Sequence, residues 1–202
     1  FPINVDSGYE GPQSALNNFN DFCSIAGVEG YSFTNKKDTQ KIISDYLVKP
    51  GFRIMSPSQR LLQNETIDLN VLYNDNEFKF FHYMKGDDVS IICFNYSLPY
   101  GIILHDMFQE KDINASLFSI NTYSSFDYKY LINDLRSTNN LIIIDDTKSA
   151  NKLSDKFLNE MYKCCNLDKV IILDRRNEQN RFYPRHDKLE IDYFSVLNEL
   201  IN

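Results

Sequence analysis

The segment Lys85–Asp146 constrains the fold more than any other part of the chain, because short apolar runs alternate in it with segments of helical spacing. Val89–Phe94 is a nearly continuous apolar run, which is typical of a strand buried on both faces. Asn114–Ile120 and Leu141–Ile144 repeat this strand pattern. The order strand, helix, strand, helix, strand predicts right-handed βαβ crossovers and a parallel sheet covered by helices.

The two helices between these strands are predicted from the spacing of their apolar residues. Pro99 stands near the first turn of the first helix, where a missing N–H costs little. The residues expected to face inward are Leu98, Ile102, Ile103 and Met107 in the first helix, and Tyr130, Leu131 and Leu135 in the second.

Strand and helix patterns continue on both sides of this segment. Upstream, we predict strands at Pro2–Val5, Gly30–Phe33 and Phe52–Met55, a helix capped by Ser14 that runs through Phe19, Phe22 and Cys23, and a helix over Lys37–Val48 with Ile42, Ile43, Tyr46 and Leu47 facing inward. Downstream, we predict a helix at Ser149–Cys165, a strand at Lys169–Leu173 and a closing helix at Ile191–Ile201 that buries Tyr193, Phe194, Leu197 and Leu200.

The segment Ser56–Met84 is polar and shows no sustained helical period, although four aromatic residues near its end indicate an extended piece. We predict that residues 58–84 are a linker between the C-terminal part of one domain, residues 1–57, and a second domain, residues 85–202. The predicted fold class is α/β, with two three-layer αβα units, of which the second has a mostly parallel sheet.

Composition excludes several classes of function. The 28 acidic and 21 basic residues give a net charge of −7, and no basic stripe exists, so nucleic acid is not an expected partner. No apolar run approaches the roughly 20 residues that a membrane helix needs. The chain begins with Phe1 in a strand-like run, and we expect it to be a fragment of a longer protein.

The metal-binding residue types lack the spacing of a metal site. His82, His105 and His186 have no partner at ligand spacing, so no metal is expected in the fragment. The four cysteines indicate reduced thiols in a cytoplasmic protein, and a vicinal redox pair at Cys164 and Cys165 is the alternative. Arginines that follow the strand Lys169–Leu173 are expected in a solvated loop, with phosphate binding as the alternative.

The succession of elements resembles the thiamine-diphosphate-dependent transketolase-like family, including the β subunits of 2-oxo acid dehydrogenases, whose pattern is the most similar. Ile25-Ala26-Gly27-Val28 is similar to a Pro-Gly turn of the pyrimidine-binding domain, with Ala26 in place of proline. The strand that ends in Asp145-Asp146 and the tail Tyr183–Ile201 are similar to the transketolase C-terminal domain. Nearly the whole chain takes part in the resemblance, which is carried by the order of its elements.

The resemblance implies an active-site edge at the loop that contains Gly11 and Pro12. We expect Asp6, Glu10, Gln13 and Ser14 to line a substrate or cofactor channel; a solvated turn with Ser14 as a helix cap is the alternative. The family usually has a histidine after the Gly-Pro pair, whereas this chain has Gln13. Asp145, Asp146 and His186 are the candidate interface residues, and Asp145 and Asp146 can alternatively anchor the next helix. No confident catalytic residue is expected.

The resemblance implies an enzyme that transfers two-carbon ketol or acyl units, with this part completing a dimer and one wall of the active site. Thiamine diphosphate and magnesium would be bound mainly outside the fragment, by a homodimer or by a heteromeric partner domain or subunit. By itself the fragment is expected to bind no cofactor and to be inactive. The first alternative is a non-catalytic assembly or binding module with the same fold. A second is a flavodoxin-like domain, which would need glycine in the turn after the first strand, where this chain has Asn95-Tyr96-Ser97.

Overall fold

The computed structural model describes residues 17–58, 67–175 and 189–201. In chain order, the elements are α1 (Phe19–Ala26), β1 (Glu29–Phe33), α2 (Lys36–Tyr46), β2 (Arg53–Pro57), β3 (Tyr73–Asn74), β4 (Phe80–Met84), β5 (Val89–Phe94), α4 (Leu98–Gln109), β6 (Ala115–Ile120), α5 (Lys129–Thr138), β7 (Asn140–Asp145), α6 (Leu153–Cys164), β8 (Lys169–Asp174) and α7 (Tyr193–Ile201). Helices and strands alternate along most of this order, so the predicted α/β class is confirmed.

A six-stranded sheet in the order β3-β4-β6-β5-β7-β8 forms the larger unit. Strands β6, β5, β7 and β8 are parallel to one another, whereas β4 and β3 continue the sheet as an antiparallel edge. The register is continuous along β5, with Ile92 opposite Phe118 of β6 and Ile143 of β7. This is the mostly parallel sheet that the apolar runs predict.

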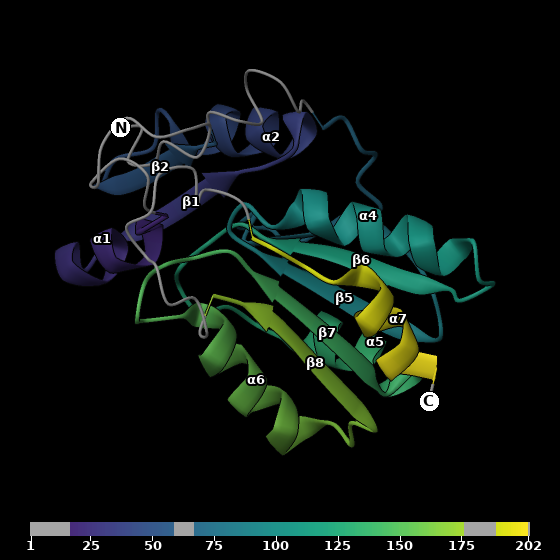
Figure 1. Cartoon of the computed structure of the whole chain (residues 1–202). Helices are drawn as coiled ribbons and strands as arrows, with labels where there is room; N and C mark the ends of the chain where they lie inside the picture. The colour runs from purple at the N-terminus through teal and green to yellow at the C-terminus, as the bar shows by residue number, and fades with distance from the viewer. Residues whose placement is uncertain (1–16, 59–66, 176–188, 202) are drawn as a thin grey trace.

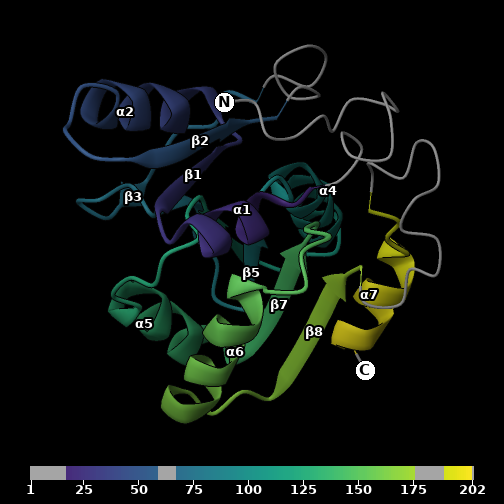
Figure 2. The same cartoon turned by 90° about the vertical axis from the view of Figure 1, so that its left-hand side faces the viewer.

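Helices cover both faces of this sheet, as Figure 2 shows from the side. On one face Ile91, Cys93 and Ile142 pack with residues of α4 and α7. On the other face Ile92, Phe94 and Ile143 pack with residues of α5 and α6. Because side chains alternate along a strand, the continuous apolar run Val89–Phe94 fills both cores at once, and every residue of β5 is buried.

The smaller unit is a parallel pair, β1 and β2, between two helices (Figure 1). Tyr31 of β1 packs in a cluster with Ile42 and Tyr46 of α2. On the other face, α1 lies so close to β1 that a Cβ atom at Gly30 would be 2.2 Å from Cys23 Sγ. This three-layer arrangement agrees with the prediction for the first unit. The predicted strand Pro2–Val5 lies outside the described residues.

Strands β3 and β4 correct the prediction for the segment between the units. Their residues fall within the predicted linker, 58–84, but they belong to the larger sheet, where Phe80 pairs with Ile120. Phe80 and Phe81 are almost completely buried, one in each core cluster. The aromatic run is therefore a strand with both faces covered. The polar residues around it led to the prediction of a linker. The division into domains stays a prediction.

Three predicted helix faces are partly wrong. In α4 the buried face contains Leu98, Leu104 and Phe108, whereas Ile103 is 46% exposed. Leu47, just after α2, is 66% exposed, and Phe194 of α7 is 73% exposed. Phe22 of α1 is half-exposed, and α1 begins after Asn18 at the N-cap position, four residues beyond Ser14.

Two adjacent residues of α4 test which of its faces packs against the sheet. We expect Leu104→Ala to lower the free energy of unfolding by about 3 kcal/mol, because it opens a cavity in a fully buried contact. Ile103→Ala should cost less than about 1 kcal/mol because its side chain is half in solvent. Urea denaturation followed by circular dichroism measures both values, and equal losses would contradict the orientation of α4.

Candidate functional site

The carboxyl ends of the parallel strands meet at the edge of the sheet that faces the smaller unit (Figure 1). The order β6-β5-β7 means that the chain leaves β5 toward one side and later returns to its other side, which creates a switch point between β5 and β7. In open α/β sheets, ligands bind outside the carboxyl ends of strands at such a point. The residues after these two strands, Asn95 and Asp145-Asp146, are therefore the first place to look for a site.

Asp145 is fully buried at this switch point and accepts three hydrogen bonds. The donors are Asn95 Nδ2 at 2.9 Å, the Thr147 backbone N at 3.0 Å and Ser154 Oγ at 2.6 Å. Burial raises the pKa of Asp145, and the contacts to Ser154, Thr147 and Asn95 oppose that rise. Ser154 lies in the first turn of α6, so Asp145 contacts the start of the next helix. This contact is the helix-anchoring alternative expected for Asp145 from the sequence.

Asp146 has a separate set of partners. Its Oδ1 accepts from Asn17 Nδ2 at 2.9 Å and from the Tyr96 backbone N at 3.3 Å. The carbonyl oxygen of Asn17 accepts from Thr147 Oγ1 at 3.0 Å and from the Lys148 N–H at 2.9 Å. The residue before α1 is thus bonded to the loop after β7. The two aspartates therefore bind different neighbours, and both lie at the switch point.

The segment Asn17–Asn20 and strand β1 contain buried polar atoms without a hydrogen-bond partner among the described residues. They are both amide atoms of Asn20, Oδ1 of Asn17 and the hydroxyl of Tyr31. Asn20 is only 1% exposed. A buried amide without a hydrogen bond costs about 1–3 kcal/mol of stability, so these atoms weaken this part of the structure.

The other sequence-predicted site residues are not tested by the structure. Asp6, Glu10, Gln13 and Ser14, together with His186, lie outside the described residues. Asp145 and Asp146 are described, and their proposed position at a subunit interface stays a prediction. Among residues 17–58, 67–175 and 189–201, no group of three or more His, Cys, Asp or Glu side chains is placed to hold a metal ion.

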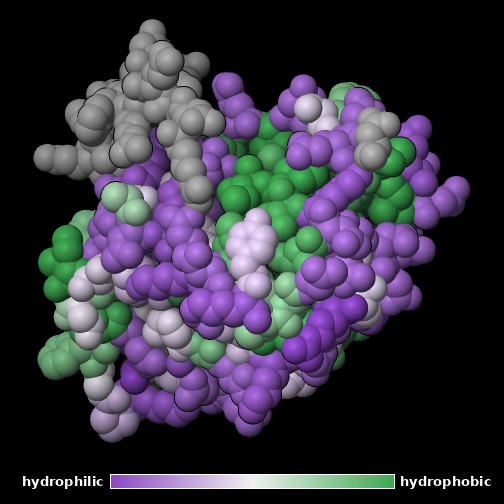
Figure 3. All heavy atoms as spheres, turned by 90° about the horizontal axis from the view of Figure 1, so that it is seen from below, coloured by the Kyte–Doolittle hydropathy of each residue, from purple (hydrophilic) through white to green (hydrophobic). Residues whose placement is uncertain are grey.

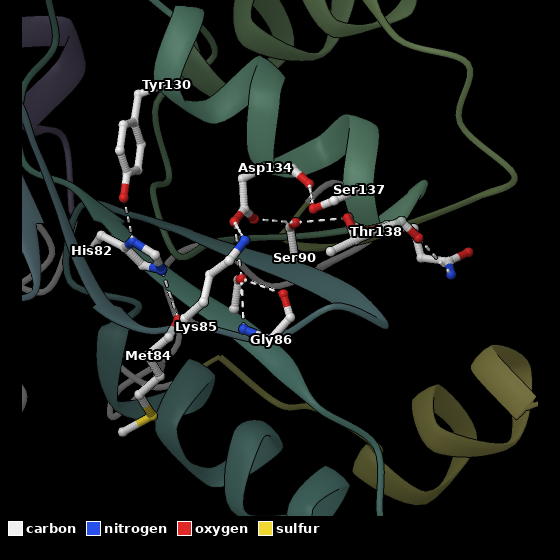
Figure 4. Close-up of polar contacts among 11 residues, drawn as sticks. His82, Met84, Lys85, Gly86, Ser90, Tyr130, Asp134, Ser137 and Thr138 are labelled. Atoms are coloured by element: carbon white, nitrogen blue, oxygen red, sulfur yellow. Dashed lines mark hydrogen bonds and ion pairs between the residues drawn. The ribbon is translucent and has the colours of Figure 1, made fainter.

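A second buried polar cluster lies at the opposite, amino end of β5 and β6 (Figure 4). Asp134 of α5 accepts from Lys85 Nζ at 2.7 Å, from Ser90 Oγ at 2.7 Å and from Ser116 Oγ at 3.1 Å. The single hydrogen of Ser116 Oγ is shared between Asp134 and the Gly86 carbonyl, which lies 3.0 Å away, and the same oxygen accepts from the Gly86 N–H at 3.0 Å. The carboxylate therefore ties the turn before β5 to α5.

His82 of β4 lies beside this cluster and is held in one tautomer by its neighbours (Figure 4). Its Nε2 is 2.8 Å from the Met84 carbonyl, which can only accept, so Nε2 carries the proton. Its Nδ1 consequently accepts from the Tyr130 hydroxyl at 2.9 Å. The ring stacks on Phe118 with centroids 4.1 Å apart, and burial lowers the pKa of His82. The neutral imidazole is a packed structural group.

Sequence reasoning missed the Asp134 cluster because Lys85 and Asp134 are 49 positions apart. A signal was present in the two serines, Ser90 and Ser116, each of which interrupts an apolar strand that is buried on both faces. A hydroxyl at such a position needs a partner within the core. That requirement predicts a buried acceptor near the strand starts, although not which residue supplies it.

The change in stability on removing the Asp134 carboxylate tests whether the Asp134 cluster has a structural or a functional role. We expect Asp134→Ala to destabilise the chain by about 2 kcal/mol, because the buried Ser90 hydroxyl loses its charged acceptor, whereas Ser116 keeps the Gly86 carbonyl. Lys85→Met should cost about 1 kcal/mol, since Ser90 and Ser116 still donate to the carboxylate. Chemical denaturation measures both. A stabilising effect of Asp134→Ala would instead identify the cluster as a strained functional site.

A fourth buried carboxyl group joins the two units. Asp38 of α2 accepts from the Tyr83 hydroxyl of β4 and, at 3.2 Å, from Asn35 Nδ2. Burial raises the pKa of Asp38 to about 7, against the lowering effect of the bonds from Tyr83 and Asn35. At mildly acidic pH this group is protonated in the folded chain but ionised in the unfolded chain, whose pKa is near 3.8.

The raised pKa of Asp38 determines how the stability of the fold changes with pH. The folded state binds a proton that the unfolded state releases, so stability is lost as the pH rises from about 4 to about 7. Asp38→Asn should therefore gain stability relative to the original chain over this window, by up to about 1.4 kcal/mol per pH unit. Urea midpoints at several pH values provide the measurement.

Tyr83→Phe tests the same carboxyl group by removing one of its hydrogen-bond donors. Because the Tyr83 bond lowers the pKa of Asp38, its removal should extend the same loss of stability to higher pH. Parallel stability profiles for the original chain and Asp38→Asn would contradict the assignment.

No protein-family model matches the sequence, and a search of curated proteins finds no relative. Comparison with solved structures finds transketolases. The chain superposes on a split-gene transketolase, described as an inactive β4 tetramer, with a TM-score of 0.52 and 12% identity, covering 73% of this chain and 48% of that one. For the transketolase of Campylobacter jejuni the TM-score is 0.57 and the identity 12%, covering 85% of this chain and 26% of that one. For a transketolase variant from Pichia stipitis the values are 0.62 and 10%, covering 99% and 29%.

These likenesses show the fold. The chain has a transketolase-like architecture with a transketolase C-terminal-like sheet, so the resemblance inferred from the sequence is confirmed at the level of fold. It spans less than half the length of the transketolases that it matches. No helix within the described ranges has the length and apolar character needed to cross a bilayer.

Proposed function

We propose, from the fold shared with transketolases, that this chain is part of a thiamine-diphosphate-dependent enzyme that transfers two-carbon ketol or acyl units. In this proposal it completes the assembly and forms one wall of an active site. The catalytic chemistry would reside largely in the cofactor. A cytoplasmic location belongs to the same proposal, and four cysteines that form no disulfide with one another fit it.

In this proposal thiamine diphosphate and magnesium are bound mainly by another domain or subunit. At the switch point, Asn17 donates a hydrogen bond to Asp146 and Asn95 donates one to Asp145. The roles of Asp6, Glu10, Gln13 and Ser14 at the channel, and of His186 at an interface, remain parts of this proposal.

The observation that carries the need for a partner is the two-stranded parallel sheet of the smaller unit. Parallel strands are normally found in larger sheets with both faces covered, and a two-stranded sheet is marginal by itself. In the described residues β2 pairs only with β1, and none of them pairs with its other edge. Close to its start, Leu47, Val48 and Phe52 are 66%, 82% and 93% exposed. A free sheet edge beside exposed apolar side chains is the surface expected for a missing neighbour.

The second candidate is a non-catalytic assembly module with the same fold. The hydrogen bonds at the switch point favour it, because Asp145 and Asp146 both bond to other residues of the chain there. Both candidates require a partner at the smaller unit, but only the first requires the cofactor in the complex.

Purification of the native complex through an affinity tag on this chain distinguishes the two. Bound thiamine diphosphate is measured by conversion to fluorescent thiochrome, and activity by consumption of a ketose phosphate or a 2-oxo acid. We expect cofactor and activity in the complex, and neither in the isolated chain. A complex with neither would support the assembly module. A monomer with no partner and no cofactor would overturn both candidates.

Phe52 tests where the partner binds. We expect Phe52→Asp to weaken assembly at least about tenfold, because it places a charge on an apolar contact surface. The matched control is Tyr162→Asp on α6, since Tyr162 is a large and exposed side chain on a different unit. Both variants should keep the stability of the original chain, and sedimentation velocity measures the assembly. Equal effects would show that the partner does not bind beside β2.

A further inference from the structure

A groove of about 330 Å³ runs along β8, the last strand of the six-stranded sheet. One wall is formed by Val170–Asp174 of β8, and the other by Leu189–Asp192 and the first turns of α7. Seen from below, hydrophobic surface gathers in one continuous area on the side of the molecule that carries β8 and α7 (Figure 3). The groove therefore follows the edge of the sheet for the whole length of the strand.

The strand beside the groove has none of the features that normally protect a sheet edge. β8 contains four consecutive apolar residues, Val170–Leu173, with no proline, no inward charge and no register shift against β7. Only Ile171 among these four is buried. Natural edge strands are usually short, charged or bulged, because their unpaired N–H and C=O groups pair readily with another strand. A regular apolar edge of six residues is suited to pairing.

The charges around the groove have one sign. The charged residues among the described residues that line it are Asp174, Glu190, Asp192 and Glu199, all of them acidic. Asp174 pairs with Lys152 at 3.1 Å, whereas Glu190 and Glu199 are exposed and form no ion pair with a described residue. An apolar floor between acidic side chains is complementary to an extended segment with apolar residues and basic ends.

We propose that the groove binds an extended segment of another polypeptide, which adds as a further strand to the outer edge of β8, with which none of the described residues pairs. Main-chain hydrogen bonds to β8 would supply affinity, and apolar side chains at alternate positions would contact Val170 and Ile172 on one face. Lysine or arginine at the ends of the segment would face Glu190 and Glu199. This inference is independent of the enzymatic proposal, because it concerns the edge at β8 and not the smaller unit, and it uses none of the cofactor chemistry.

A second copy of β8 is a less suitable occupant than a basic segment. Two copies would bring two sets of the same acidic side chains to one contact, and like charges across an interface cost stability. Lys169, the one basic residue of β8, already donates its Nζ to the carbonyl oxygens of Glu199 and Leu200.

Three synthetic peptides test the proposal by fluorescence anisotropy with the full chain. The first has alternating valine and threonine with two lysines at each end; the second has glutamates at the ends; the third is the lysine peptide with two central prolines. We expect only the lysine peptide to bind, with weaker binding at high salt. Proline removes main-chain donors, so the third peptide should lose binding if strand pairing is the mode.

Hydrogen exchange locates the contact, and two variants of the chain control for charge. The lysine peptide should slow amide exchange within residues 169–174 of β8 and leave β3, at the other edge, unchanged. Glu190→Lys with Glu199→Lys should weaken binding of the lysine peptide at least about tenfold, whereas Glu110→Lys after α4 should not.

Other outcomes overturn the proposal. No binding of the lysine peptide at about 1 mM, a dissociation constant outside the specific range, would remove the groove as a strand-binding site. Equal binding of the proline peptide would show charge attraction without strand addition. Concentration-dependent protection of β8 in the chain alone would show that a second copy occupies the edge.

Discussion

The structure depends on β5, the strand that both cores share. Its odd-numbered residues pack against α4 and α7, and its even-numbered residues pack against α5 and α6. β6 and β7 pair with it on either side, so the sheet cannot form without it. Fully burying side chains of this size stabilises a fold by about 1.5–3 kcal/mol each, and here consecutive residues contribute to two separate clusters. The three layers of the larger unit follow from this one strand.

The same strand sets the position of the switch point, and the chain uses this point for internal contacts. The Asn95 backbone adopts a positive φ of 57°, which turns the chain directly after β5 and brings its amide to Asp145. Asp146 and Thr147 then bond to Asn17 ahead of α1. At the position where many α/β proteins bind a ligand, this chain thus forms hydrogen bonds to the segment that precedes α1.

Much of the fold follows from local pattern, and the parts that do not are those set by distant contacts. Val89–Phe94 and Leu141–Ile144 are correctly predicted as strands because burial on both faces produces an uninterrupted apolar run. Ile103 has the same hydropathy as a core residue, but the position of β6 relative to α4 decides that Leu104 faces the sheet instead. β4 lies among polar residues, and its pairing with β6, nearly 40 positions away, gives it a place in the sheet. The Asp134 cluster and the Asp38–Tyr83 contact likewise join residues that no local pattern connects.

The two sheets leave edges of different character, and this difference bears on what each can bind. Among the described residues, the edge at β2 belongs to a two-stranded parallel sheet and lies close to exposed apolar side chains, so the proposed partner there is a folded domain that buries surface. The edge at β8 belongs to a complete six-stranded sheet, and its groove has room between β8 and α7 for little more than a single extended chain. At the opposite end of that sheet, β3 is only two residues long, and its Tyr73 ring stacks on Tyr130 of α5 with centroids 4.1 Å apart. A short edge strand offers few main-chain groups for pairing with another strand. Among the described residues, β8 is therefore better suited to strand pairing than β3. The asymmetry means that assembly through the smaller unit and strand addition at β8 use separate surfaces, and occupation of one need not block the other.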